Sequence, residues 1–271
     1  MNKLRVAISS PHDKNLYSLL VAKICHDDPE IELVGVCCLK VFSFKRISFE
    51  VKRLGPRLIQ KILNKYLYKS KDALADGFSV LIDDYNLKED SLKKFCKNIN
   101  VNLSKISDPN DLNSINFLSY AKPDVIVSIG SIILKDVFIS IPSLGVLNVH
   151  KGILPDYRGM GVTEWPLLHS VKEEKAKLGV TSHLIERGVD TGPILAVKHL
   201  NLKDLTCIDD VEPRYLKITI EAMQEGLNSA KKGFNSQTPQ LDDEGKQYFE
   251  LHHRLRDAVD IRLNKYFHGK K

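Results

Sequence analysis

The sequence is poor in the residues that mark several common classes of protein. Its five cysteines are scattered and form no CxxC pair, which argues against a disulfide framework and a zinc site and favours a reducing cytoplasm. No run approaches the roughly 20 apolar residues that cross a bilayer. The opening MNKLRVAISS reaches charged residues too soon to be typical of a signal peptide. With 15 glycines and 11 prolines among 271 residues, collagen-like and low-complexity classes are excluded as well.

The composition that remains is that of an ordinary globular protein. Hydrophobic residues make up 43% of the chain and charged residues 27%, enough apolar surface to offset the entropy of ordering. The net charge of +6 is concentrated, because residues 40–72 hold ten Lys and Arg against two acidic residues. A nucleic-acid-binding surface spread over the whole protein is therefore not favoured.

The segment 50–69 has the pattern of a basic amphipathic helix. Apolar residues recur every four positions from Leu54 to Tyr66, beside Arg53, Arg57, Lys61 and Lys65. We favour a solvated helix that covers one edge of a sheet. The alternatives are a weak contact with an anionic membrane surface and a contact with nucleic acid.

Strand-like and helix-like segments alternate along the first 200 residues. Strands are predicted at 4–9, 31–38, 101–106, 124–130, 144–150, 178–185 and 193–200, and helices at 14–26, 88–98, 111–120, 161–170 and 208–232. This order predicts an α/β, Rossmann-like fold with a mostly parallel sheet and helices on both faces. The alternation stops near 204, so we expect a catalytic domain at 1–204 and a small C-terminal appendage, a helix and a hairpin, at 205–271.

Two predicted strand ends carry residues suited to acyl transfer. Asn148 and His150 point to the same face because they are two apart in a strand, and Asp190 follows the strand 178–185. An amide and an imidazole can donate hydrogen bonds to a developing oxyanion, and a carboxylate can hold the imidazole and move a proton. The alternative is that these residues only form turns and caps.

The strings around these residues favour the catalytic interpretation. NVHKGILPDYRG (148–159), GVTSHLIERGVDTGPIL (179–195) and PDVIVSIGSIILKDVF (123–138) together resemble the N10-formyltetrahydrofolate-dependent formyltransferases. The resemblance covers 120–200 in detail, with three motifs in the same order and at matching separations.

The resemblance implies a role for each of these segments. Asn148 and His150 would polarise the formyl carbonyl, and Asp190 would pair with His150 and relay a proton through a water. N10-formyltetrahydrofolate would be the cosubstrate, with no metal required. The residues implied to hold it are Ile132, Ile133 and Leu134 around the pterin, and Glu186, Arg187, Gly188 and Val189 through their backbone.

The acceptor of the formyl group follows by comparison within that family. Glycinamide ribonucleotide enzymes carry a glycine-rich phosphate loop after the first strand, and here residues 9–15 read SSPHDKN, without glycine. Methionyl-tRNA enzymes end in a barrel, for which about 70 residues after position 200 are too few. Formyltetrahydrofolate hydrolases carry an additional N-terminal domain. We therefore expect a nucleotide-linked amino sugar, as in O-antigen and lipopolysaccharide synthesis, with tRNA, the glycinamide ribonucleotide and a hydrolytic or non-catalytic relative as alternatives.

Contacts to such a sugar nucleotide are expected in the turn after the catalytic strand. Arg158 suits a diphosphate, Tyr157 a ring, and Lys151 lies nearby in the sequence. The alternative for Arg158 is a purely structural turn contact, and Trp165 is expected in the core. The family and the tail suggest a cytoplasmic homodimer.

Overall fold

The computed structural model describes residues 3–40, 73–130, 132–170, 177–201, 211–241 and 243–252, with isolated positions up to 261. The basic helix predicted at 50–69 lies outside these residues. The predicted domain boundary after residue 204 falls in 202–210 and lies outside them as well.

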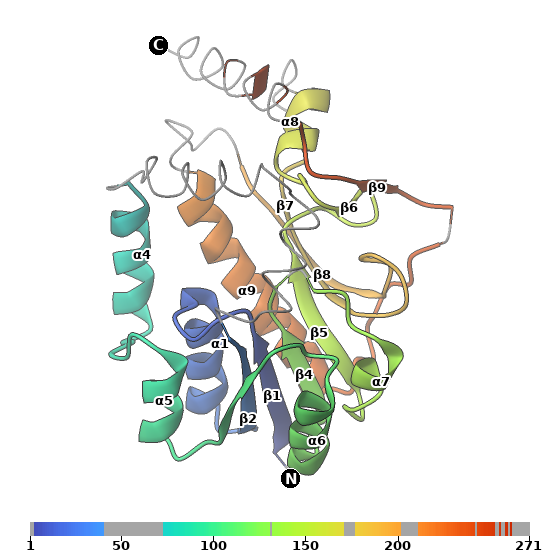
Figure 1. Ribbon diagram of the computed structural model, residues 1–271. Coiled ribbons are helices and arrows are strands. Elements are labelled where there is room, and N and C mark those ends of the chain that lie inside the picture. Colours follow the sequence, from blue (N-terminus) through green and yellow to red (C-terminus); the bar gives the residue numbers. More distant parts are fainter. Residues whose placement is uncertain are drawn as a thin grey trace.

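A seven-stranded sheet with the order β3-β2-β1-β4-β5-β7-β8 forms the centre of the fold (Figure 1). Its strands are β1 (Leu4–Ser10), β2 (Ile31–Leu39), β3 (Leu103–Ile106), β4 (Val125–Ser128), β5 (Gly145–His150), β7 (Gly179–Leu184) and β8 (Ile194–His199). The first five strands in this order pair in parallel, whereas β7 runs antiparallel to both β5 and β8. The predicted mostly parallel α/β fold is therefore confirmed.

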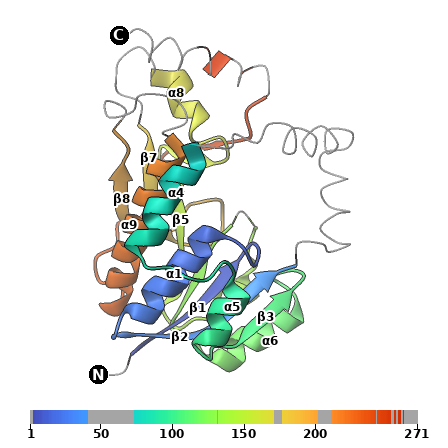
Figure 2. The ribbon, with the colours of Figure 1, turned by 90° about the vertical axis from the view of Figure 1, so that its left-hand side faces the viewer.

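Helices cover both faces of this sheet (Figures 1 and 2). One face carries α1 (Leu16–Asp27), α4 (Ala73–Asp84), α5 (Leu92–Asn98) and α9 (Val211–Lys231), and the other carries α6 (Leu112–Ala121) and α7 (Asp136–Ile139). The strands alternate between two apolar cores accordingly. Val6 and Ile8 pack in the first core and Ala7 in the second, and Val125 and Ile126 divide in the same way.

Local side-chain chemistry sets where the predicted helices begin. The Asn15 side chain accepts a hydrogen bond from the Ser18 backbone N–H at 2.8 Å, and Asp111 accepts one from Ser114 at 2.9 Å. Each residue caps the helix that follows it, so α1 and α6 begin one residue later. Ser91 caps α5 in the same manner, which shortens the helix predicted at 88–98.

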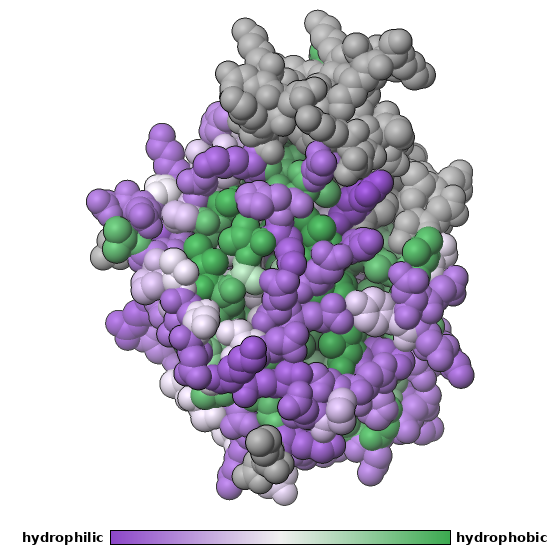
Figure 3. All heavy atoms as spheres, turned by 180° about the vertical axis from the view of Figure 1, so that it is seen from behind, coloured by the Kyte–Doolittle hydropathy of each residue, from purple (hydrophilic) through white to green (hydrophobic). Residues whose placement is uncertain are grey.

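Helix α4 was not among the predicted elements. Gly77 lies within it, and glycine weakens a helical pattern. No helix in the described ranges is long and apolar enough to cross a membrane. On the face opposite to that of Figure 1, hydrophilic side chains dominate and apolar ones gather in smaller groups between them (Figure 3).

The described part of the C-terminal tail returns to the strands that precede it. Thr238 forms an antiparallel bridge with Ile194, and β9 (Lys246–Tyr248) pairs in parallel with β6 (Tyr157–Gly159), which follows β5 (Figure 1). The sequence predicts a hairpin in the C-terminal appendage, and residues 245–249, GKQYF, are the candidates for it. Their strand instead joins the turn after β5, because the free backbone groups of β6 offer it a partner.

Candidate active site

The pairing of β5 with β7 gathers four polar side chains on one face. In the antiparallel register Asn148 lies opposite His183, and His150 lies opposite Thr181. Asn148 and His150 are two residues apart in β5, as Thr181 and His183 are in β7, so all four side chains project to the same side of the sheet. The Thr181 hydroxyl, which is fully buried, donates to Gly152 O at 2.7 Å and accepts from Leu154 N at 3.0 Å. It thereby ties down the loop that leaves β5.

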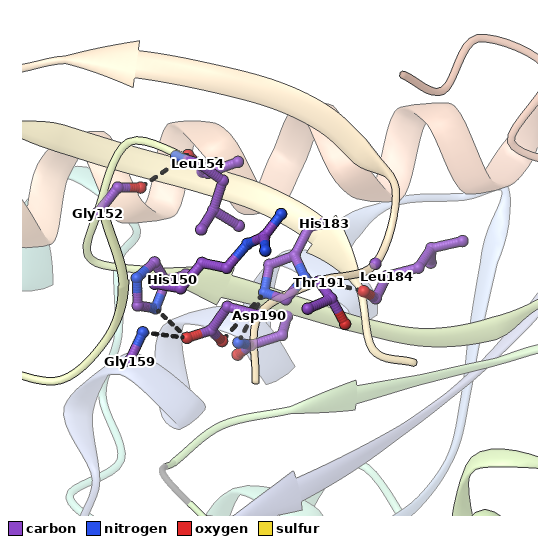
Figure 4. Close-up of polar contacts among 12 residues, drawn as sticks. His150, Gly152, Leu154, Gly159, His183, Leu184, Asp190 and Thr191 are labelled. Atoms are coloured by element: carbon purple, nitrogen blue, oxygen red, sulfur yellow. Dashed lines mark hydrogen bonds and ion pairs between the residues drawn. The ribbon is translucent and has the colours of Figure 1, made fainter. Parts of the chain in front are cut away.

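Asp190 reaches this face by a route that the sequence did not reveal. Because β7 is antiparallel to β5, its last residue, Leu184, lies opposite Leu147 and not at the end of β5. The following loop must therefore fold back along the sheet. Asp190 adopts a positive φ of 54° in this loop, and its carboxylate Oδ2 lies 3.3 Å from His150 Nδ1 (Figure 4).

The Asp190 carboxylate is held by several groups at once. Oδ2 also accepts a hydrogen bond from the Gly159 backbone N–H at 2.8 Å, whereas Oδ1 lies 3.7 Å from His183 Nε2, too far for a hydrogen bond. The carboxylate is 17% exposed, so substrate or water can still reach it. A hydrogen bond to an ionised group contributes about 1.5–3 kcal/mol, enough to fix its rotamer.

His150 has an acceptor at each ring nitrogen. Nε2 donates to the Tyr157 backbone carbonyl at 2.9 Å, while Nδ1 faces Asp190. Only the doubly protonated ring can donate to both at once. A hydrogen bond from His150 to a substrate oxygen therefore requires one of these contacts to open. The ring also leaves no space beside it, because a Cβ at Gly152 would lie 2.7 Å from Nε2.

His183 is a site residue that the sequence analysis missed. Its side chain is 1% exposed, and burial lowers its pKa from the ordinary 6.5 to about 4, with Asp190 opposing and His150 adding to the shift. The neutral ring donates from Nδ1 to the Leu184 carbonyl at 2.8 Å, so Nε2 must accept. It faces the Asn148 amide nitrogen at 3.3 Å. This contact fixes which way the Asn148 amide points and leaves its second N–H available.

The signal for His183 was present in the string GVTSHL. Thr181 and His183 alternate with apolar or small residues in a strand, as Asn148 and His150 do in theirs. Recognising the two pairs as neighbours required the antiparallel register, which strand patterns alone do not give.

The two segments predicted to hold the cosubstrate lie against each other. The Arg187 guanidinium forms an ion pair with Asp136, with Nε 2.9 Å from the carboxylate, which holds the pKa of Asp136 below and that of Arg187 above its usual range. Ile132 and Ile133 are 42% and 81% exposed, whereas Leu134 is buried.

The chemistry of this region fits a flat heteroaromatic ring. The exposed isoleucines offer an apolar surface. Glu186 and Gly188 are exposed residues and Val189 is half-buried, and their backbone groups are the candidates for hydrogen bonds beside that surface. Asn110 braces the isoleucine segment, donating to Ile133 O at 3.0 Å and accepting from Lys135 N at 2.7 Å.

The residues predicted to contact a sugar nucleotide are less open. Arg158 is 8% exposed and directs Nε and Nη2 to Gln240 at 3.1 and 2.9 Å. Tyr157 is buried and stacks on Tyr248, with ring centres 5.3 Å apart. Lys151 is exposed, and its ammonium lies 5.5 Å from the centre of the Tyr215 ring.

Tyr157 and Tyr248 are part of an aromatic cluster beside the site. His169 from α8 (Glu164–Ser170) lies 3.3 Å from the Tyr157 hydroxyl through Nδ1. Trp165 is half-buried, not fully in the core as predicted. It contacts the Tyr248 ring and donates from Nε1 to Phe249 O at 2.9 Å.

The glycine-free loop 9–15 makes contacts of its own. Asn15 accepts from Ser18 at the start of α1, and Asp13 accepts the backbone N–H groups of Leu92 and Lys93 at 2.9 Å, through its carbonyl and its carboxylate respectively. The loop is thus bound to the first turn of α5, and a carboxylate stands beside it.

Fold and site together define an α/β protein with an Asn–His–Asp cluster suited to acyl transfer. Within the described ranges, no three histidine, cysteine or carboxylate side chains come together as metal ligands. Residues 93–227, which include the whole cluster, match the formyl transferase family. Through this domain the chain belongs to that family.

Similar proteins include enzymes with different acceptors. Methionyl-tRNA formyltransferases from Thermodesulfovibrio yellowstonii and Clostridioides difficile are 29% and 32% identical over 157 and 125 residues. These matches cover 57% and 45% of this chain but only 49% and 39% of the relatives. The chain thus spans about half the length of these relatives or less.

Two solved structures share the fold over most of the chain. Glycinamide ribonucleotide transformylase 1 from Symbiobacterium toebii has a TM-score of 0.54 at 16% identity, covering 90% of this chain and 92% of its own. The N-formyltransferase from Helicobacter canadensis, in complex with folinic acid and dTDP-3-aminofucose, has a TM-score of 0.53 at 14% identity, covering 91% and 71%.

Proposed function

We propose that this protein transfers the formyl group of N10-formyltetrahydrofolate to the primary amine of a nucleotide-linked amino sugar. The observation that carries the proposal is the meeting of Asn148, His150 and Asp190 on one face, with a neutral His183 behind them. Family membership of residues 93–227 supports the same reaction type.

In the proposed mechanism the protein supplies hydrogen-bond donors to the formyl oxygen and one carboxylate that accepts a proton. N10-formyltetrahydrofolate supplies the carbon. Asn148 directs its free amide N–H to the formyl oxygen and stabilises the charge that develops there. The amine nitrogen forms the new C–N bond, and the bond between the formyl carbon and N10 breaks. Asp190, directly or through a water, takes the proton that the amine loses and returns a proton to N10.

The choice of acceptor rests on two supports. The loop 9–15 is glycine-free, caps its own helix and carries Asp13, which disfavours the phosphate of a glycinamide ribonucleotide there. The similarly folded H. canadensis enzyme is described in complex with an amino-sugar nucleotide. The competing acceptor is methionyl-tRNA, because the two sequence relatives described above are methionyl-tRNA formyltransferases.

A mass-spectrometric screen tests the proposal directly. Purified protein and N10-formyltetrahydrofolate are incubated with a panel of nucleotide amino sugars, with glycinamide ribonucleotide and with methionyl-tRNA, and Asn148→Ala serves as the matched control. A gain of one formyl group on a nucleotide sugar, lost in the variant, is the expected result. Formylation of tRNA alone would replace the acceptor, and release of formate without any acceptor would replace transfer by hydrolysis.

A further inference from the structure

The Gln240 side chain lies at the centre of a hydrogen-bond network behind the catalytic carboxylate. Nε2 donates to the backbone carbonyls of Asp190 and Gly192 at 3.0 and 2.6 Å, and Oε1 accepts from Arg158 at 3.1 and 2.9 Å. The carbonyls can only accept and the guanidinium can only donate, so the amide has one possible orientation. Both of its N–H groups and both lone pairs are used.

The backbone that Gln240 binds needs support. Asp190 holds a positive φ of 54°, a conformation that L-residues other than glycine rarely adopt, and Gly188 has a φ of 111°. Gly192 is packed so closely that a Cβ would lie 2.0 Å from Leu184 O. The two hydrogen bonds from Gln240 hold this loop at the backbone carbonyls of Asp190 and Gly192.

The segment that carries Gln240 is anchored on both sides of it. Thr238 exchanges two hydrogen bonds of 2.8 Å with Ile194, and β9 pairs with β6. In that pairing Gly159 lies opposite Tyr248, and Gly159 is the residue whose N–H donates to the Asp190 carboxylate. The tail therefore supports Asp190 at its backbone and at its side chain.

We propose that Gln240 is a positioning residue that sets the place of the Asp190 carboxylate in the transfer step, which rests on the proposed function. Arg158 contributes to this positioning because its two hydrogen bonds hold the Gln240 side-chain carbonyl in place. This assigns to Arg158 a role within the protein instead of the diphosphate contact predicted from its sequence position.

Three variants test this role. Gln240→Met keeps the length and removes all four hydrogen bonds. Gln240→Glu keeps an oxygen that accepts from Arg158. Its second oxygen replaces the amide nitrogen and cannot donate to the Asp190 and Gly192 carbonyls. Gln247→Met, an exposed glutamine of the same tail, is the matched control. We expect kcat to fall roughly 10- to 100-fold in both Gln240 variants, as for a misplacement of about 1 Å, with a smaller change in KM.

A double-mutant cycle separates positioning from general loosening. If Gln240 acts through Asp190, Gln240→Met causes no further loss of kcat in an Asp190→Asn background. An equal loss in both backgrounds overturns the proposal. Should Gln240→Met fail to fold, Gln240→Glu carries the same cycle.

A measurement without activity keeps the inference independent of the proposed function. The Gly159 amide should exchange with solvent at least about tenfold faster in the Gln240 variants, while the Met160 amide, bonded to Tyr248 O at 2.9 Å, remains protected. Equal acceleration of both amides means that the tail has merely detached, and an unchanged Gly159 means that Gln240 does not act on the carboxylate. Either result refutes the proposal, whether or not the wild-type protein transfers formyl groups.

Discussion

Replacing His183 by phenylalanine should make the stability of the protein less dependent on pH. The native ring has a pKa of about 4, whereas in the unfolded chain it has its ordinary 6.5. Between these values the unfolded state binds a proton that the native state does not. The contribution of His183 to stability is therefore complete above pH 6.5 and is lost progressively as the pH falls to about 4.

The size of the effect follows from the same two values. Each pH unit in this interval lowers the free energy of unfolding by up to about 1.4 kcal/mol, so the whole interval is worth about 3 kcal/mol. Phenylalanine fills similar space but leaves the Leu184 carbonyl and the Asn148 amide without their partner, which costs about 1–3 kcal/mol at any pH. The variant should thus be less stable at pH 7.5 and lose less stability on acidification.

Urea unfolding of wild type and His183→Phe at pH 7.5 and 4.5 measures both effects. The exposed His199, replaced by glutamine, is the matched control for the loss of a histidine outside the site. The decisive quantity is the loss of unfolding free energy between pH 7.5 and 4.5, compared between wild type and His183→Phe, because other groups titrate in both proteins. If the two proteins lose stability equally on acidification, His183 is not the buried neutral ring described above.

Three further predictions concern activity. Asn148→Ala should lower kcat roughly 10²- to 10³-fold in steady-state assays with little change in the folate KM, and near-normal turnover would remove Asn148 from the oxyanion site. Arg187→Gln should leave the melting temperature nearly unchanged, because the ion pair of Arg187 with Asp136 is largely exposed. The same variant should raise the folate KM severalfold. An unchanged folate KM would mean that folate binding does not need this ion pair. Changing Arg53, Arg57, Lys61 and Lys65 together to glutamine should leave the acceptor KM unchanged, and a large, salt-sensitive rise in that KM would point to tRNA instead.

Most of the sheet could be predicted because its signals are local. Buried parallel strands appear as short apolar runs, and the caps Asn15 and Asp111 mark where two helices begin. The direction of β7 could not be predicted in this way, because an apolar strand pattern is the same in either direction. That direction explains why Asp190 is not simply at the next strand end.

The candidate active-site cluster could be predicted only in part, for the same reason. Asn148, His150 and Asp190 lie in strings that resemble a family, whereas the contacts that hold them in place cross long stretches of sequence. His183 is set by strand register, and Gln240 lies 50 residues after Asp190 and 82 after Arg158. Pairwise packing at such separations leaves no periodic pattern to detect.

The pairing of β6 with β9 has a consequence for how the enzyme is made. On the ribosome, at about 5–20 residues per second, the sheet and the histidines are synthesised several seconds before residues 238–248 emerge. A nascent chain of that length holds Asn148 and His150 but not the clamp on Asp190. The proposed catalytic arrangement is thus completed late in synthesis, and truncation within this stretch should yield a folded sheet in which the Asp190 carboxylate is no longer held in place.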